Sequence, residues 1–193
     1  MEARRGRTPP SSPRRRLFSV GEFHALSRAG ILRETDRVEL IRGEILRISP
    51  IGSRHAACVD RLTRNLVVQV GARAIVRIQN PLRLGSRSEV QPDIALVRPA
   101  RDFYAKAHPD PRDVRLLVEV AEQAEIERRV KIPLYADHRV REVWLVDLGR
   151  GLVEAYSRPA EGRYRDIRRE GPEGVLKPRA LGGISVAVKD LLG

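Results

Sequence analysis

The fold of this 193-residue chain is decided by two short apolar runs, Gln91-Pro92-Asp93-Ile94-Ala95-Leu96-Val97 and Leu116-Leu117-Val118-Glu119-Val120. Each run is rich in branched aliphatic side chains and is flanked by turn or polar residues, which is typical of a buried strand. A segment with helical character follows at 124–137. A third apolar run, Val143-Trp144-Leu145-Val146-Asp147, comes after it. We therefore predict two strands, a helix and a third strand in this order.

Each of the first two runs holds one acidic residue, Asp93 or Glu119. Ionised carboxylates are rare in buried strands unless they are paired, hydrogen-bonded or bound to a cation. A divalent metal ion would explain both acids together. The alternatives are a strand-start acid that faces solvent at Asp93 and an acid on the polar face of a half-covered strand at Glu119. Lys131, on the predicted helix, would in that case form an ordinary surface pair with Glu127, four residues away.

These residues resemble a known nuclease motif. Pro92-Asp93, Glu119-Val120 and Lys131 are similar to the motif of the PD-D/E-x-K superfamily, which has the restriction-endonuclease-like fold. A longer, ordered set of segments between residues 17 and 192 resembles the bacterial Uma-two family of endonucleases. The segments are Val38-Glu39-Leu40-Ile41-Arg42-Gly43-Glu44, Ser49-Pro50, His55, Leu117-Val118-Glu119-Val120, Lys131-Ile132-Pro133-Leu134-Tyr135-Ala136 and Glu142-Val143-Trp144-Leu145-Val146-Asp147.

The resemblance implies an α/β (α+β) fold with a mixed β-sheet core. The implied order is α-β-β-β-α-β, flanked by helices and preceded by an N-terminal helix and a β-hairpin. Elementary topology agrees with this order, because strands joined by turns pair antiparallel and strands joined by a helix pair in parallel.

Local signals predict where the individual elements lie. Ser19 and Glu22 form a capping box, which opens a helix that ends near Gly30. Arg42-Gly43 predicts a tight hairpin turn. The other elements are expected at 37–41 and 44–48 (hairpin strands, ended by Ser49-Pro50), 53–71 (helix), 75–79 (strand), 82–88 (strand or turn), 98–114 (polar excursion with a short helix near Phe103), 152–156 and 164–168 (strands), and 181–192 (strand and terminal helix).

The resemblance also implies the chemistry of the site. Asp93 and Glu119 would bind Mg²⁺ or Mn²⁺, with the backbone carbonyl of Val120 as the third protein ligand. These cations prefer hard oxygen ligands and keep several waters. The metal would polarise a phosphoryl oxygen and lower the pKa of the attacking water. Lys131 would orient that water and offset negative charge in the transition state.

The chain departs from the common motif at the lysine. The motif places it two residues after the glutamate, where this sequence has Ala121, and the Uma-two family places it on the following helix, at Lys131. Pro133 is expected to perturb that helix, because proline lacks the N–H that a helix interior needs. Gln123 lies near a polar loop position of the family.

The resemblance gives His55 and Glu44 supporting roles. His55 opens the predicted helix on its apolar face and is expected to point inward. It either contacts a metal-bound water or a phosphate, or makes an ordinary helix-start hydrogen bond. Glu44 either completes the metal site or faces solvent on the hairpin. Tyr135 is expected in the core or beside the site, four residues after Lys131, and Cys58 is expected to be a small buried side chain.

The net charge of +12 favours a polyanionic partner. Residues 1–16 hold six arginines and one glutamate and so carry +5 of this charge. This basic tail either contacts nucleic acid electrostatically or is a disordered, solubilising extension. We expect one domain over residues 17–193. With no apolar stretch of membrane-spanning length, no signal-peptide pattern and a single cysteine, a cytoplasmic location is expected.

The sequence thus predicts a metal-dependent endonuclease that hydrolyses phosphodiester bonds in nucleic acid, with DNA as the expected substrate. Cutting both strands of a duplex with one site per chain favours a homodimer. Two alternatives stay open, because a fold does not fix a function. One is a degenerate nuclease fold that binds nucleic acid or a protein without cutting. The other is a basic nucleic-acid-binding protein that depends on its tail.

Overall fold

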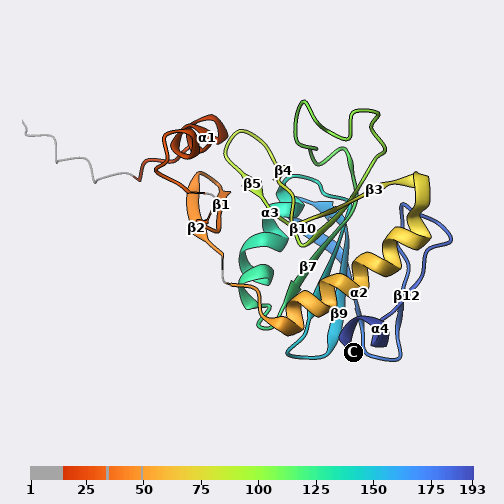
Figure 1. Ribbon diagram of the computed structural model, residues 1–193. Helices are drawn as coiled ribbons and strands as arrows, with labels where there is room; N and C mark the ends of the chain where they lie inside the picture. Colours follow the sequence, from red (N-terminus) through yellow and green to blue (C-terminus); the bar gives the residue numbers. More distant parts are fainter. Residues whose placement is uncertain (1–14, 34, 49) are drawn as a thin grey trace, which may run out of the picture.

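The computed structural model describes residues 15–33, 35–48 and 50–193 (Figure 1). Most of the predicted basic tail and Ser49, at the predicted end of the hairpin, lie outside the described residues. Within these ranges, every helix is too short or too polar to cross a membrane.

A six-stranded mixed sheet forms the centre of the fold, with the strand order β10-β9-β8-β7-β6-β3. Its strands are β3 (Ile75–Ile78), β6 (Ile94–Val97), β7 (Val114–Ala121), β8 (Glu142–Asp147), β9 (Leu152–Ala160) and β10 (Arg163–Glu170). β7 and β8 pair in parallel, and the other neighbours pair antiparallel. With α2 (Ser53–Val70) before β3 and α3 (Ile132–Asp137) before β8, the predicted α-β-β-β-α-β order is confirmed.

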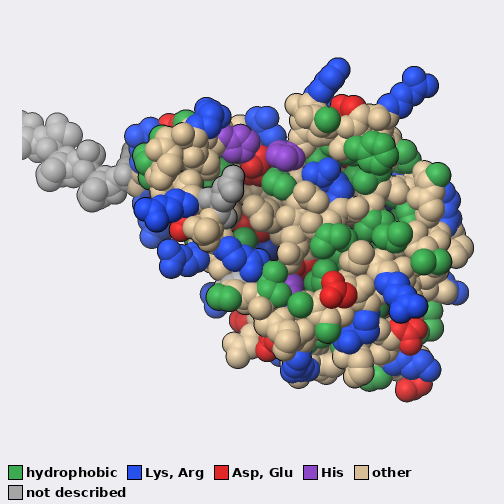
Figure 2. All heavy atoms as spheres, in the orientation of Figure 1, with side chains coloured by type: hydrophobic (Ala, Val, Ile, Leu, Met, Phe, Trp, Pro, Cys, Tyr) green, Lys and Arg blue, Asp and Glu red, His purple; other side chains and the backbone are tan. Residues whose placement is uncertain are grey.

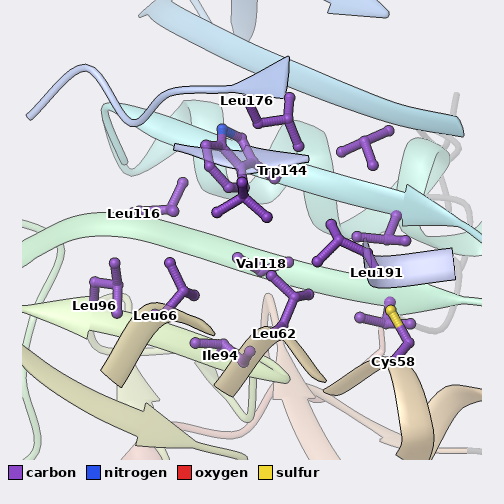
Figure 3. Close-up of a cluster of buried hydrophobic side chains, with 14 of the residues drawn as sticks. Cys58, Leu62, Leu66, Ile94, Leu96, Leu116, Val118, Trp144, Leu176 and Leu191 are labelled. Atoms are coloured by element: carbon purple, nitrogen blue, oxygen red, sulfur yellow. The ribbon is translucent and has the colours of Figure 1, made fainter. Parts of the chain in front are cut away.

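Helices cover both faces of this sheet, so its central strands are buried on both sides. On one face Leu62 and Leu66 of α2 lie beside Ile94 and Val118 in an apolar cluster that also holds Trp144, which lies beside Leu176 (Figure 3). On the other face α3 contributes a second apolar cluster. Its members include Leu134 and Tyr135 of α3 and Ala95, Leu117, Val143 and Leu145 of the sheet.

The alternation of side chains along β7 decides where its acid lies. Val118 and Val120 belong to the cluster under α2, whereas Leu117 and Ala121 belong to the cluster under α3. Because successive strand residues point to opposite faces, Glu119 points to the α3 face, in phase with Leu117 and Ala121. An acid is therefore placed inside the apolar layer that carries the lysine-bearing helix.

A small sheet with the order β2-β1-β5-β4 stands beside the main sheet. Its strands are β1 (Val38–Ile41), β2 (Glu44–Arg47), β4 (Leu82–Arg83) and β5 (Glu89–Val90), and α1 (Val20–Arg28) packs on it. The capping box of Ser19 and Glu22 is confirmed. The hairpin is also confirmed: Arg42 and Gly43 both have positive φ, 50° and 86°, as a two-residue turn of matching twist requires.

Some local predictions were wrong. No helix forms near Phe103; this residue and Tyr104 have positive φ values of 50° and 63° within successive turns, which a right-handed helix cannot accommodate. The helix predicted at 124–137 is divided into a π-helical turn, η2 (Glu127–Lys131), and α3. Near the C-terminus, β12 (Val186–Ala187) and α4 (Lys189–Leu192) match the prediction. The partner strand β11 (Val175–Leu176) and the turn η1 (Gly71–Arg73) were not predicted.

The hairpin turn supplies a test of the fold. A Cβ at Gly43 would lie 2.7 Å from the Leu17 Cβ, whereas Gly30, with φ of 72°, has open space around it. Gly30→Ala should therefore lower the free energy of unfolding by about 1 kcal/mol, the cost of a left-handed conformation. Gly43→Ala should lower it by at least about 2 kcal/mol, because overpacking is added. Equal effects of the two variants in urea titrations would contradict the turn geometry.

Candidate active site

A cavity of about 480 Å³ lies between the hairpin β1–β2, the start of α2, the ends of β6 and β7, and η2. Among the charged or titratable side chains that line it are Glu39, His55, Asp93, Glu119 and Lys131. Asp93, Glu119 and Lys131, which were predicted from separate segments, are therefore brought together by the fold.

Asp93 lies just before β6 and is 8 % exposed. Its Oδ2 atom accepts hydrogen bonds from the Val120 amide at 2.8 Å and from His55 Nε2 at 3.1 Å. Its Oδ1 atom accepts one from Gln79 Nε2 at 3.1 Å. Burial raises the pKa of Asp93, but the bonds from His55 and Val120 outweigh it and hold the pKa below its ordinary value. Asp93 is therefore ionised at neutral pH.

Glu119 experiences the opposite environment. It is 2 % exposed, and both carboxylate oxygens lie 3.3 Å from Lys131 Nζ. The Tyr135 hydroxyl donates a hydrogen bond to it. Burial raises the pKa of Glu119 to about 8; Lys131 opposes this rise, whereas the charges of Asp93 and Glu39 add to it. Two neighbouring carboxyl groups thus differ in their affinity for a proton, a pattern common at catalytic sites.

Lys131 is buried and donates to Glu39 Oε1 at 3.1 Å as well as to Glu119. Burial lowers the pKa of Lys131, but the carboxylates of Glu119 and Glu39 raise it more, so the ammonium stays protonated. It ends η2, where the Ile132 amide donates to the Glu127 carbonyl, five residues earlier.

The effect of Pro133 on the helix is visible at this turn. In a regular α-helix the proline ring would clash with the carbonyl four residues earlier. The wider π-helical turn just before Pro133 avoids this arrangement, and α3 continues beyond it. The predicted perturbation is therefore a change of helix type, and it leaves Lys131 and Tyr135 both directed at Glu119.

Glu39 is the residue of this cluster to which the sequence analysis gave no role. It is 3 % exposed, lies on β1, and accepts from the Gln91 amide at 2.7 Å in addition to Lys131. The signal was the one used for Glu119: a single acid inside the apolar strand Val38-Glu39-Leu40-Ile41. Its partner Lys131 is 92 residues away in the sequence, so only the fold reveals the contact.

The remaining candidates divide into those inside and outside the cavity. His55 points inward as predicted, and its Nδ1 atom is buried without a hydrogen-bond partner among the described residues. The Asp93 bond raises the His55 pKa, although burial opposes it. Glu44 lies elsewhere: it pairs with Arg15 at 2.7 Å, its side chain is 44 % exposed, and it does not line the cavity. Gln123 lies at the exposed rim, and Cys58 is fully buried.

The oxygen donors of the site suit a small divalent cation. Asp93 and Glu119 offer two carboxylates. Val120 follows Glu119 on β7, two residues past Val118, the last β7 residue that pairs with β6, and its amide donates to Asp93. The Ala121 carbonyl accepts from the Leu148 amide on the β8 side. Because neighbouring strand carbonyls point in opposite directions, the Val120 carbonyl points toward the Asp93 side. Within the described ranges no group of three or more His, Cys, Asp and Glu side chains could hold a metal ion, so a bound cation would depend on this backbone oxygen and on water.

The fold and the buried acid pair at the ends of β6 and β7 define a restriction-endonuclease-like protein. The chain belongs to the Uma2 family, described as "Putative restriction endonuclease", because the family model matches residues 20–189. The predicted resemblance to the Uma-two family is thereby confirmed, and the family assignment supports a nuclease.

A solved structure at low sequence identity shows the same fold. A structure described as a "putative nuclease belonging to DUF820 from Anabaena variabilis" matches with a TM-score of 0.71 and 18 % identity, over 91 % of this chain and 97 % of that chain. The type IIG restriction endonuclease BpuSI matches with a TM-score of 0.41 and 14 % identity, over 75 % of this chain and 16 % of that one. No curated protein matches the sequence.

The raised pKa of Glu119 predicts a pH dependence of stability. A folded-state pKa of about 8, against an ordinary value of 4.5, means that the folded chain binds this proton more tightly. Stability should therefore fall as pH rises from about 4.5 to about 8, by at most about 1.4 kcal/mol per pH unit. Glu119→Gln should flatten this slope in denaturant titrations with chelator between pH 5 and pH 9. The raised His55 pKa acts in the same direction, and the Glu119 charge contributes to it, so the difference between parent and variant reports Glu119 together with its effect on His55. An unchanged slope in the variant would contradict the assignment.

Proposed function

We propose that this protein is a metal-dependent endonuclease that hydrolyses phosphodiester bonds in DNA. The observation that carries the proposal is one cavity, open to solvent, that contains an ionised Asp93, a buried Glu119 and a protonated Lys131. Asp93 lies just before β6 and Glu119 on β7, and Lys131 lies on the helical turn that follows, which is where the resemblance to the Uma-two family implies the lysine. Family membership supports the same class of reaction.

Asp93, Glu119 and the Val120 carbonyl would hold Mg²⁺ or Mn²⁺. When bound, such a cation supplies Lewis acidity toward a phosphoryl oxygen and lowers the pKa of a bound water. Hydrogen bonds to Asp93 from His55 and from the Val120 amide orient this carboxylate. Outer partners of this kind fix a ligand in place before a cation arrives.

Lys131 has a partner that does not depend on Glu119. If the Glu119 carboxylate turns toward a cation, Glu39 still accepts from the Lys131 ammonium at 3.1 Å. Lys131 would then keep its position and its proton although Glu119 no longer pairs with it. A protonated lysine beside the scissile phosphate would offset the charge that develops in the transition state. Because its pKa is raised, Lys131 acts by its charge and not as a general base.

A nucleic-acid substrate is supported by the charge around the cavity. Arg37 and Arg47 line it and are exposed. Arginine side chains gather over the lobe of α1, β1 and β2 beside it (Figure 2). Basic side chains beside a hydrolytic site bind a phosphate backbone, and such binding weakens steeply with salt. A duplex substrate with two strands to cut favours a two-fold dimer, which analytical ultracentrifugation would detect.

A second candidate function is a nuclease fold that binds nucleic acid or a protein without cutting. Lys131 and Tyr135 already occupy the oxygens of Glu119. A cation must therefore compete with an internal ammonium for that carboxylate. If the ammonium prevails, Asp93 alone is too weak a site, and the protein binds its partner without hydrolysis.

Metal binding distinguishes the two functions without a guess about substrate. Calorimetry with MgCl₂ or MnCl₂ should detect one site in the parent chain. Asp93→Asn and Glu119→Gln should each weaken it at least about 100-fold, since loss of an outer partner alone costs about 10–100-fold. Glu44→Gln is the matched control, because Glu44 lies outside the cavity, and its affinity should equal that of the parent. Parent-like binding by Asp93→Asn and Glu119→Gln would refute the proposed ligands, and no binding by the parent would favour the second function.

The role of Lys131 is tested by hydrolysis. With a labelled duplex and Mg²⁺ or Mn²⁺, Lys131→Gln should retain metal binding but lower the cleavage rate by about 10²–10³, a typical loss for one group that stabilises transition-state charge. Circular dichroism of the variant controls for folding. Cleavage by Lys131→Gln at the parent rate would remove the lysine from the mechanism.

A further inference from the structure

A second buried ionic cluster lies outside the cavity, between η2 and the end of the main sheet. Arg128 donates to Asp147 at 2.5 Å and to Glu154 at 2.9 Å. Glu154 also accepts from Tyr156 at 2.6 Å and from Arg169 at 3.0 Å. The two carboxylates are 3 % and 2 % exposed, and the Arg128 side chain is 18 % exposed. The proposed chemistry makes no use of this cluster.

Arg128 and Lys131 belong to the same helical turn, η2, but reach different clusters. Arg128 bonds to β8 and β9, whereas Lys131 bonds to Glu119 on β7 and to Glu39 on β1. In a regular α-helix, residues three apart lie on the same face. The i→i−5 bond from Ile132 to Glu127 widens this turn. The wider turn increases the angle between the Arg128 and Lys131 side chains around the helix axis, so the two side chains reach two different carboxylate clusters.

We propose that Arg128 is a positioning residue for Lys131: its forked contact with Asp147 and Glu154 fixes the π-helical turn in the register that aims the Lys131 ammonium at Glu119 and Glu39. The importance of this aim for hydrolysis rests on the proposed function. The positioning itself does not, because it concerns only contacts within the chain.

The turn needs an external anchor because it has little stability of its own. It is five residues long, and π-helical turns are rare and poorly self-stabilised. Pro133, the second residue after the turn, has no backbone N–H to donate. The planar guanidinium of Arg128 can bind two acceptors at a fixed angle, which a lysine ammonium cannot reproduce. A fork that is held on two strands constrains both the position and the rotation of the turn.

Arg169 is the matched control for this role. It binds the same Glu154 carboxylate, but from β10, and its side chain is 63 % exposed. Removing Arg169 perturbs the charge of the cluster without touching the helical turn. If removal of Arg128 exposes the Lys131 ammonium and removal of Arg169 does not, the cause is lost positioning of the turn and not a general loss of the ionic cluster.

The lysine content of the chain allows a direct measurement. The four lysines are Lys106, Lys131, Lys177 and Lys189, and Lys131 is the one that is buried. Exposed ammonium protons exchange rapidly with water, whereas a buried, hydrogen-bonded ammonium is protected. In chain labelled with ¹⁵N-lysine, at neutral pH and without metal, we expect one protected side-chain ammonium signal. Its disappearance in Lys131→Gln assigns it.

The signal should be lost in Arg128→Gln and kept in Arg169→Gln. Arg128→Lys retains the charge without the fork, so its Lys131 ammonium protons should exchange faster than those of the parent and more slowly than those of Arg128→Gln. This variant adds a fifth labelled lysine, whose own signal is the one that persists in Arg128→Lys/Lys131→Gln. If Arg128→Gln does not fold, Arg128→Lys decides the question by the same exchange rate. Parent-like exchange in the Arg128 variants, equal loss in Arg169→Gln, or no protected signal in the parent would overturn the proposal. Cleavage is not measured, so failure of the nuclease function does not affect the outcome.

Discussion

The Lys131 ammonium, enclosed by the carboxylates of Glu119 and Glu39, is the interaction on which the architecture of the site depends. Each of these charges would be very costly to bury alone. Together they join three parts of the chain: the hairpin strand β1, the central strand β7 and the turn η2. The cluster thus holds the small N-terminal sheet against the main sheet and gives the cavity its walls. Removal of one partner would leave an uncompensated charge among apolar side chains.

The two acids of the motif differ because their surroundings differ. Asp93 accepts hydrogen bonds from a backbone amide, a histidine and an amide side chain, all of which favour its charged form. Glu119 is enclosed by Leu117 and Ala121 along its own strand face, and its neighbours include two other carboxylates. One acid is therefore prepared to meet a cation, and the other gives up a proton more reluctantly. A cation that binds both carboxylates would neutralise the negative charge that the Lys131 ammonium neutralises only in part.

The short helical segment after β7 resolves a conflict between proline chemistry and site geometry. Pro133 is incompatible with a regular helix around Arg129, and the chain responds with a wider turn. That turn separates Arg128 from Lys131 and directs them to two buried clusters, one at the end of β8 and one at β7. The π-helical turn thus sets the direction of the Lys131 side chain, and the neighbouring strands hold that direction through their contacts with Arg128 and Lys131.

The sequence by itself determined the layers and most of the elements. Capping at Ser19, the Arg42-Gly43 turn and the apolar runs at 94–97 and 116–120 act through neighbouring residues, so pattern and spacing were enough to predict them. The sequence also indicated Asp93 and Glu119, because an acid in an apolar strand is a local anomaly. Only the tertiary structure decided which further acid joins Asp93 and Glu119 in the cavity. Glu39 and Glu44 lie on the same face of one hairpin, but Glu44 pairs opposite Ile41 beside the turn, and Glu39 pairs opposite Leu46. The two positions are about 7 Å apart along the strand at the usual rise per residue. Only the docking of that hairpin against η2, 92 residues away at Lys131, selects Glu39, and no local pattern encodes such a long-range register.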